Sequence, residues 1–192
     1  MASQTVAPRP SEARDRLLLT AAGLFYNNGV HAVGVDEIIS RAQTTRSTFY
    51  RHFPSKDELI VSYLRLADQQ IRDAVATATS NPKSPDAAVR AIANFVAGQV
   101  KSPEFRGCAF LKAAAEYSDP ADPIHQAILA HRTWFHDTVL AAFKQVTRRA
   151  PQATAHFVML RDGAMAEGCL ADPKVVARTF LNGIDGMLKS FE

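Results

Sequence analysis

The segment 35–56 contains two short helical patterns separated by a polar turn, and this arrangement restricts the possible folds more than any other feature of the chain. The apolar residues of the first pattern recur at helical spacing: Val35, Ile38, Ile39 and Ala42. In the second pattern, Phe49 and Phe53 are four residues apart, so both side chains fall on the same face of a helix. We therefore expect two short helices joined by a tight turn, each with one face directed inward.

The opposite face of the second helix is polar and carries Arg46, Ser47, Tyr50 and Arg51. Arginine can bind guanine edges or phosphate, small hydroxyl groups permit close approach, and a tyrosine hydroxyl can bind a phosphate oxygen. This combination predicts a helix that lies in the major groove of DNA. An ordinary solvated helical hairpin is the alternative, because helix-turn-helix geometry also occurs in proteins that do not bind DNA.

Four runs of sequence within and around this segment carry a family resemblance. They are Thr45–Phe53 (TRSTFYRHF), Pro54–Leu59 (PSKDEL), and, upstream, Ala21–Phe25 (AAGLF) and Asn28–Gly29. Together they resemble the DNA-binding signature of the TetR/AcrR family of transcriptional regulators, over about the first third of the chain. The resemblance implies an all-α homodimer whose second domain binds a small effector and thereby releases DNA.

The resemblance also assigns roles to individual residues. It implies base or nearby phosphate contacts for Arg46, Ser47 and Thr48, and phosphate contacts for Tyr50, His52 and Lys56. The complete set of predicted DNA-binding residues is Val35, Thr45, Arg46, Ser47, Thr48, Tyr50, Arg51, His52 and Lys56.

Two residues of the turn depart from the family pattern. Gln43 stands where glycine is usual, and Thr44 stands where an apolar residue is usual. A left-handed conformation at Gln43 would cost on the order of 1 kcal/mol. The base contacts implied by the resemblance therefore depend on the shape of this turn more than the phosphate contacts do.

Helix start signals predict an all-α chain of about nine helices. Ser11 is a candidate cap for the first helix, and Ser55–Glu58 has the spacing of a capping box. Four further starts combine a capping residue with proline: Ser84–Pro85, Ser102–Pro103, Asp122–Pro123 and Asp172–Pro173. A further helix is expected near Pro151.

These signals divide the chain into three parts. Residues 1–10 form a polar arm, residues 11–66 a helix-turn-helix DNA-binding domain, and residues 67–192 an effector-binding and dimerisation domain. Arg9 and Arg14 are candidates to contact the DNA backbone or minor groove, and a solvated tail is the alternative.

The second domain is expected to hold a pocket for an apolar or aromatic small molecule. Its candidate lining residues are Tyr63, Phe95, Phe105, Phe110, Tyr117 and Trp134, each of which could equally be plain core. The 106–135 segment, with its GCAFLKAAAEY run, also resembles the effector domain of one subgroup of these regulators, whose effectors are not uniform.

The last two helices are expected to form a two-fold dimer interface, because glycine within a helix favours close approach of a neighbour. The predicted interface residues are Leu160, Gly163, Val176, Phe180, Ile184 and Met187. Packing of the same residues within one chain is the alternative.

The remaining chemistry favours a DNA-binding regulator over an enzyme. No glycine-rich phosphate loop, HExxH or GxSxG motif is present, so we expect no catalytic residues, no cofactor and no metal. His125, His131 and His136 are spaced six and five residues apart, which places them on different helix faces. Cys108 is expected to be a buried, inert thiol.

The expected function is therefore a repressor that effector binding releases from a palindromic operator. An activator or a constitutive DNA-binding protein without effector is the alternative. A small helical metal-dependent enzyme using His131, His136, Asp137 and Asp162 is a further one. Without an apolar signal core or a long apolar run, the protein is expected to be cytoplasmic and not membrane-bound.

Overall fold

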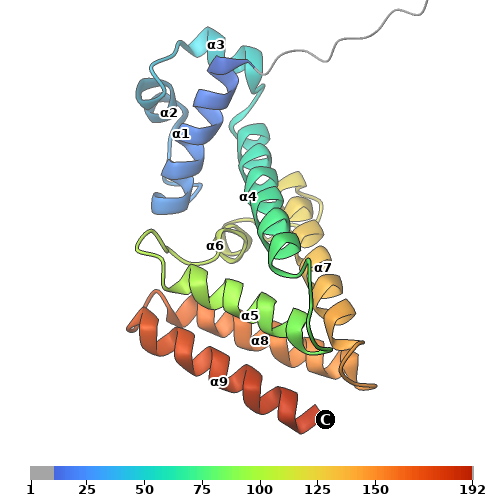
Figure 1. Ribbon diagram of the computed structural model, residues 1–192. Coiled ribbons are helices and arrows are strands. Elements are labelled where there is room, and N and C mark those ends of the chain that lie inside the picture. Colours follow the sequence, from blue (N-terminus) through green and yellow to red (C-terminus); the bar gives the residue numbers. More distant parts are fainter. Residues whose placement is uncertain (1–10, 192) are drawn as a thin grey trace, which may run out of the picture. The chain divides into compact units, whose positions relative to one another are not determined.

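The computed structural model describes residues 11–191, whose regular secondary structure consists of nine helices (Figure 1). The predictions of an all-α fold and of about nine helices are confirmed for this part of the chain. The arm predicted for residues 1–10, including Arg9, lies outside the described residues. The chain divides into two compact units, residues 1–63 and 64–192, and the division falls three residues before the predicted one.

The first unit is built around α1, which runs from Glu12 to Asn28. The following helices are α2 (Val35–Arg41), α3 (Arg46–His52) and the beginning of α4 (Lys56–Ala78). Its core comes from all of them, and the side chains that are essentially inaccessible to solvent include Leu17, Phe25, Ile38, Phe49 and Leu59. The short helices α2 and α3 both contact α1, so packing compensates for their low intrinsic stability.

The second unit contains the end of α4 and five further helices. They are α5 (Ala87–Val100), α6 (Ala109–Glu116), α7 (Pro123–Phe143), α8 (Ala150–Glu167) and α9 (Pro173–Phe191). Within this unit α9 packs against both α5 and α8, and α7 packs against α6 and α8 (Figure 1). Helix α4 is thus a single element that contributes residues to both units.

Most of the predicted helix starts are confirmed. The Asp122 side chain accepts a hydrogen bond from the amide of Ile124 (2.7 Å), and Asp172 accepts one from the amide of Lys174 (2.9 Å). The Ser55 hydroxyl accepts one from the amide of Glu58 (3.1 Å), as the capping-box spacing predicts.

The two starts predicted at Ser84–Pro85 and Ser102–Pro103 are wrong. The Ser84 hydroxyl donates to the carboxylate of Asp86 (2.5 Å), and Asp86 itself occupies the N-cap position of α5. The Ser102 hydroxyl accepts a hydrogen bond from the amide of Glu104 in a local turn (3.3 Å), and α6 begins only at Ala109. In both cases the serine bonds to a residue two positions later, which favours a turn over a helix.

Candidate functional site

The turn between α2 and α3 has the left-handed conformation that the sequence leaves in question at Gln43. Gln43 has φ = 50° and is the one non-glycine residue with positive φ in the described chain. The amide of Thr44 donates to the carbonyl of Ile39 (3.1 Å), which is the backbone bond of a helix that ends in a left-handed residue. The Arg16 side chain of α1 donates to the carbonyl of Ala42 (3.0 Å) and ties this helix end to the rest of the unit.

Helix α3 begins with a side-chain cap at Thr45. Its hydroxyl accepts a hydrogen bond from the amide of Thr48 (3.2 Å) and donates one to the hydroxyl of Thr48 (2.9 Å). Phe49 on the inner face of α3 and Phe53, the extended residue that directly follows this helix, are both buried with their ring centroids 6.2 Å apart, which confirms that the two side chains point inward together. The cap and the two rings fix where α3 begins and how it is rotated.

The outer face of α3 is exposed and basic. Arg46, Ser47, Tyr50 and Arg51 are all exposed, and the Tyr50 ring lies nearly perpendicular to that of Phe49 with 5.1 Å between centroids. Arg46 forms an ion pair with Asp36 of α2, and both side chains remain largely solvated. The charge of Arg46 is therefore held close to the turn but remains accessible to solvent.

The remaining candidate DNA-binding residues are spread around this face. Val35 begins α2 and is half-buried. The ammonium group of Lys56 donates to the carbonyl of His31 (3.4 Å) at the start of α4. His52 Nε2 lies 3.3 Å from the Ser11 hydroxyl. Ser11 occupies the N-cap position of α1 but makes no capping hydrogen bond, so that part of its predicted role is wrong.

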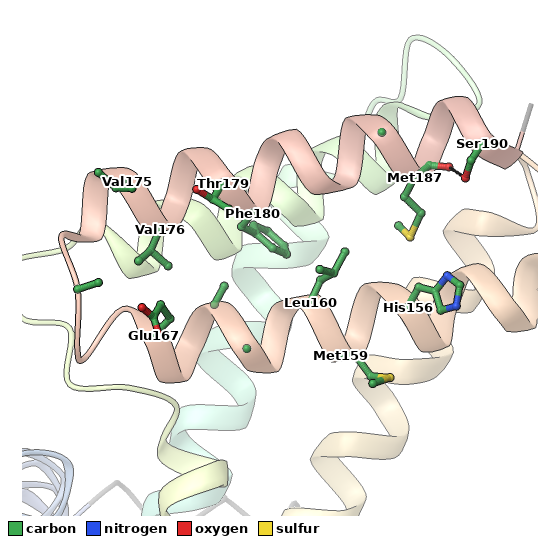
Figure 2. Close-up of a pocket in the computed structure, with 14 residues that line it drawn as sticks. His156, Met159, Leu160, Glu167, Val175, Val176, Thr179, Phe180, Met187 and Ser190 are labelled. Atoms are coloured by element: carbon green, nitrogen blue, oxygen red, sulfur yellow. Dashed lines mark hydrogen bonds between the residues drawn. The ribbon is translucent and has the colours of Figure 1, made fainter.

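An apolar groove of about 920 Å³ runs between α8 and α9 in the second unit. Figure 2 shows Leu160, Phe180 and Met187 directed into the space between these helices. Some apolar side chains of the groove are exposed, including Met159 at 73% and Leu160 at 40% of full exposure, and exposed apolar patches are typical of interaction surfaces. Of the six residues predicted for the dimer interface, five line the groove: Leu160, Gly163, Val176, Phe180 and Met187. The sixth, Ile184 of α9, is buried and does not line the groove.

The glycines near this groove have two different structural reasons. A side chain at Gly168 would lie 2.9 Å from Phe105 and from Val100, so this glycine permits close packing within the chain. Gly163 and Gly186 line the groove, and a side chain at either would meet nothing within 4 Å. Packing within one chain therefore does not account for these two.

A second cavity, of about 350 Å³, is formed by α6, α7 and α8. Its walls include the rings of Phe110 and Phe135, and Phe110 is stacked on the buried His131 with 3.6 Å between ring centroids. Two arginines, Arg132 and Arg161, also line it. Cationic and aromatic side chains thus face the same small space.

The cavity is connected to α4 through His131. Its Nδ1 atom lies 2.7 Å from the Asp68 carboxylate, and Asp68 in turn accepts a hydrogen bond from Arg72 (2.6 Å). The Arg72 guanidinium lies over the Trp134 ring, 4.4 Å from its centroid. Burial lowers the pKa of His131, and the hydrogen bond with Asp68 only partly opposes this effect.

Comparison with known proteins identifies the family. The profile of the bacterial regulatory proteins of the tetR family matches residues 17–63, which include α2 and α3. A TetR-family transcriptional regulator from Streptomyces coelicolor is 52% identical, with a TM-score of 0.91, over 94% of this chain and 96% of that one. The protein belongs to the TetR family. It is accordingly a DNA-binding transcriptional regulator and not an enzyme.

Curated relatives of this TetR-family protein match over shorter stretches. The transcriptional activator FasR of Mycolicibacterium smegmatis is 39% identical over 89 residues, which are 44% of this chain and 41% of FasR. The transcriptional regulator LmrA of Bacillus subtilis is 25% identical over 64% of this chain and 67% of LmrA. The aligned stretch thus spans less than half the length of FasR. Among residues 11–191, none of the helices is both long enough and apolar enough to cross a membrane.

The residues predicted for a ligand pocket are dispersed in this TetR-family protein. Phe110 lines the cavity between α6, α7 and α8. Tyr63 packs against Phe25 in the first unit, with 5.7 Å between ring centroids. The carbonyl of Tyr117 contacts His125 Nδ1 (2.7 Å). Phe95, Phe105 and Trp134 are half-buried and do not line this cavity.

Sequence reasoning missed the polar residues of the cavity. Arg161 falls on the buried face of α8, four residues after Phe157, and a charged residue at an apolar position of the helical period was the available signal. Spacing along the sequence connects His131 only with a metal or enzyme site, whereas the structure places it in the wall of this cavity. Within residues 11–191, no three His, Cys, Asp or Glu side chains gather in a way that could hold a metal ion.

Proposed function

We propose that the protein binds a palindromic operator as a homodimer in the cytoplasm and represses transcription until a small-molecule effector releases it. The DNA-binding surface is assigned from the separation of the two faces of α3. Phe49 and Phe53 fix the inner face, whereas Arg46, Tyr50 and Arg51 remain exposed on the other. A short helix held in this way can enter a major groove without losing any core contact.

The individual roles follow from what each side chain is free to do. Arg46 and Ser47 are assigned to base edges or nearby phosphates, because both are exposed at the start of α3. The Thr48 hydroxyl accepts a hydrogen bond from the Thr45 hydroxyl, so these two residues support the helix start. Their remaining hydrogen-bonding capacity is assigned to phosphate contacts. Tyr50, Arg51, His52 and Lys56 are assigned to phosphates, and Val35 to the apolar edge of the contact.

Arg46 must leave Asp36 in order to reach DNA. Their ion pair is exposed on both sides, and such pairs contribute about 1 kcal/mol or less. DNA phosphates and guanine edges can therefore displace Asp36 at little cost, while the pair keeps Arg46 near its DNA-binding position in the free protein.

The experiment for DNA binding compares Arg46→Ala with the control Arg148→Ala, which replaces an exposed arginine of the second unit. On an operator selected from random DNA, Arg46→Ala should lose roughly 1–3 kcal/mol of binding free energy and discriminate less between sequences. Lys56→Ala should weaken binding to all sequences and reduce its salt dependence. Fluorescence anisotropy at several salt concentrations measures both effects. Indifference of binding to Arg46→Ala and Lys56→Ala would contradict the assignment of this surface.

We infer that the groove between α8 and α9 is filled by the same helices of a second copy. Several of its apolar residues are exposed, and Gly163 and Gly186 leave room that no residue within 11–191 occupies. A two-fold arrangement of two helices from each copy buries such a surface as a four-helix bundle. Two recognition helices would then face half-sites about 34–36 Å apart on a palindromic operator.

Leu160→Glu tests this dimer more cleanly than a change at Phe180. Phe180 packs against Phe157 with 5.9 Å between ring centroids, so replacing it also damages the core. A glutamate at the exposed position 160 is solvated in a monomer but costs several kcal/mol inside an apolar interface. We expect Leu160→Glu to be monomeric by light scattering and to bind operator weakly. The control Leu129→Glu, at an exposed leucine of α7 outside the groove, should remain dimeric.

The proposed switch acts through α4. This helix begins beside α3 in sequence, and its Asp68 and Arg72 contact His131 and Trp134 of α7. A ligand that displaces His131 would disturb these contacts and could move α4. Thermodynamics requires that the effector bind better to the DNA-free state, and that DNA weaken effector binding by the same factor. The fluorescence of Trp134, the single tryptophan of the chain, would report on the change.

Activation is the second candidate function, because FasR, a relative of part of this chain, is named as an activator. Transcription of a reporter placed behind the selected operator distinguishes the two. Repression is supported if transcription falls when the protein is added, and activation if transcription rises.

A further inference from the structure

The cluster of charges beside the cavity between α6, α7 and α8 is not balanced. Arg132 donates to one oxygen of Asp162 (2.7 Å), and Arg161 donates to the other (2.8 Å). Two guanidinium groups therefore share a single carboxylate. The neighbouring Asp68 is already paired with Arg72, so it does not supply the missing negative charge.

Arg161 is the less satisfied of the two arginines. Its side chain is only 7% exposed, and its second terminal nitrogen donates to the sulfur of Cys108 at 3.3 Å, a weak acceptor. Its Nε group is buried and has no hydrogen-bond partner. A buried guanidinium stays charged, so each unpaired N–H group costs free energy until an acceptor reaches it.

The lining of the cavity complements an anion. Arg132 and Arg161 both line it, together with the hydroxyl-bearing Thr133, and no Asp or Glu is among the described residues of its wall. The aromatic side chains of Phe110 and Phe135 supply a flat apolar surface. A volume of about 350 Å³ is near the lower end of the range for small-molecule sites.

We propose that this cavity binds a small organic carboxylate, whose charged group is held by Arg161 and Arg132 and whose apolar body lies against Phe110 and Phe135. Guanidinium groups bind carboxylates through paired, charge-assisted hydrogen bonds, so the ligand supplies the negative charge that the cluster lacks. The inference rests on the proposed function, because this ligand is the effector. It narrows the effector from an apolar or aromatic molecule to one that also carries an acidic group.

The same anion would act on α4. His131 lines the cavity and bonds to Asp68 of α4, so a ligand that fills the space beside Phe110 contacts a residue that is hydrogen-bonded to this helix. Arg132 is the neighbour of His131 on α7, so the anion site and the hydrogen bond to Asp68 share one segment of this helix. In this proposal, ligand binding is coupled to DNA release through the segment of α7 that carries His131 and Arg132.

The test uses the purified full-length protein and three carboxylates, benzoate, phenylacetate and hexanoate, each paired with its neutral amide. Binding is measured by titration calorimetry, and operator release by fluorescence anisotropy. We expect at least one carboxylate to bind roughly tenfold or more tightly than its amide, a difference of about 1.4 kcal/mol. Arg132→Gln should remove this preference, whereas Arg148→Gln, at an exposed arginine outside the cavity, should retain it.

Arg161→Gln should also remove the preference, and circular dichroism establishes whether this variant is folded. If it is not folded, Arg132→Gln, at a position 37% exposed, decides alone. Amides that bind as well as the acids would overturn the proposal. So would operator release by neutral or cationic compounds with no response to the acids, an outcome that leaves the proposed function intact. If no compound of any class changes operator affinity, the effector part of the proposed function fails as well.

Discussion

The two units of the molecule use arginine in opposite ways. On α3, Arg46 is 62% exposed, and its partner Asp36 is 77% exposed. On α8, Arg161 is 7% exposed and shares Asp162 with Arg132. Water stabilises the first arginine in any arrangement, so it can exchange its partner for DNA at little cost. The second arginine is largely shielded from water, so the charged state of its guanidinium depends on the anionic groups around it.

The same carboxylate-to-amide exchange should therefore have very different effects in the two units. Asp162→Asn leaves two arginines without their carboxylate and should reduce the free energy of unfolding by about 3 kcal/mol. Asp36→Asn should reduce it by about 1 kcal/mol or less. Urea denaturation followed by circular dichroism measures both values. Equal losses in the two variants would remove the contrast between the units.

A carboxylate ligand provides a second test of the contrast between Asp162→Asn and Asp36→Asn. If a small acid supplies the missing charge, its presence should recover part of the stability lost in Asp162→Asn, because a ligand that binds only the folded state stabilises it. The Asp36→Asn variant should gain no more from the ligand than the unsubstituted protein does.

The pH dependence of stability should originate partly in the second unit. Burial lowers the pKa of His131 in the folded protein, with Arg161 and Arg72 adding to this and Asp68 opposing it. The unfolded chain therefore binds a proton at His131 at higher pH than the folded chain does. Stability should fall as the pH drops below about 6.5, the ordinary pKa of histidine, and level off below the folded pKa.

His131→Asn should flatten this dependence, and thermal unfolding at a series of pH values measures it. The control His136→Asn, at a histidine whose side chain is 48% exposed, should keep the slope of the unsubstituted protein. Parallel profiles for His131→Asn and the unsubstituted protein would show that another group is responsible.

The smallest effect is expected at the turn of the first unit. Gln43 has a left-handed conformation that glycine adopts without strain, so Gln43→Gly should relieve about 1 kcal/mol of strain. The greater freedom of glycine in the unfolded chain offsets part of this gain. We expect a net stabilisation of about 0.5 kcal/mol with unchanged operator affinity, measured by urea denaturation and anisotropy. A loss of affinity would mean that the Gln43 side chain itself takes part in DNA binding.

The first unit could be predicted closely because its information is local. Phe49 and Phe53 are one helical turn apart, and the cap at Ser55 acts on a residue three positions later. The cavity of the second unit depends on distant pairs. His131 bonds to a residue 63 positions away, and Arg161 to one 53 positions away. Helical periodicity fixes which side of a helix is buried but not which helix covers it, so Arg161 was missed and only Phe110 of the predicted pocket residues lines the cavity.

Core packing and proposed DNA contact are served by different faces of α3, and this separation affects how regulators of this kind diversify. Thr45 caps the helix, and Phe49 and Phe53 hold it in the core, so none of these residues needs to change when the operator changes. Ser47, Tyr50 and Arg51 are exposed, and among them only Tyr50 has a ring contact with the core, at Phe49. A duplicated gene can therefore acquire a new DNA target through a few substitutions on one face, each nearly neutral for folding, while the scaffold that presents that face is inherited unchanged.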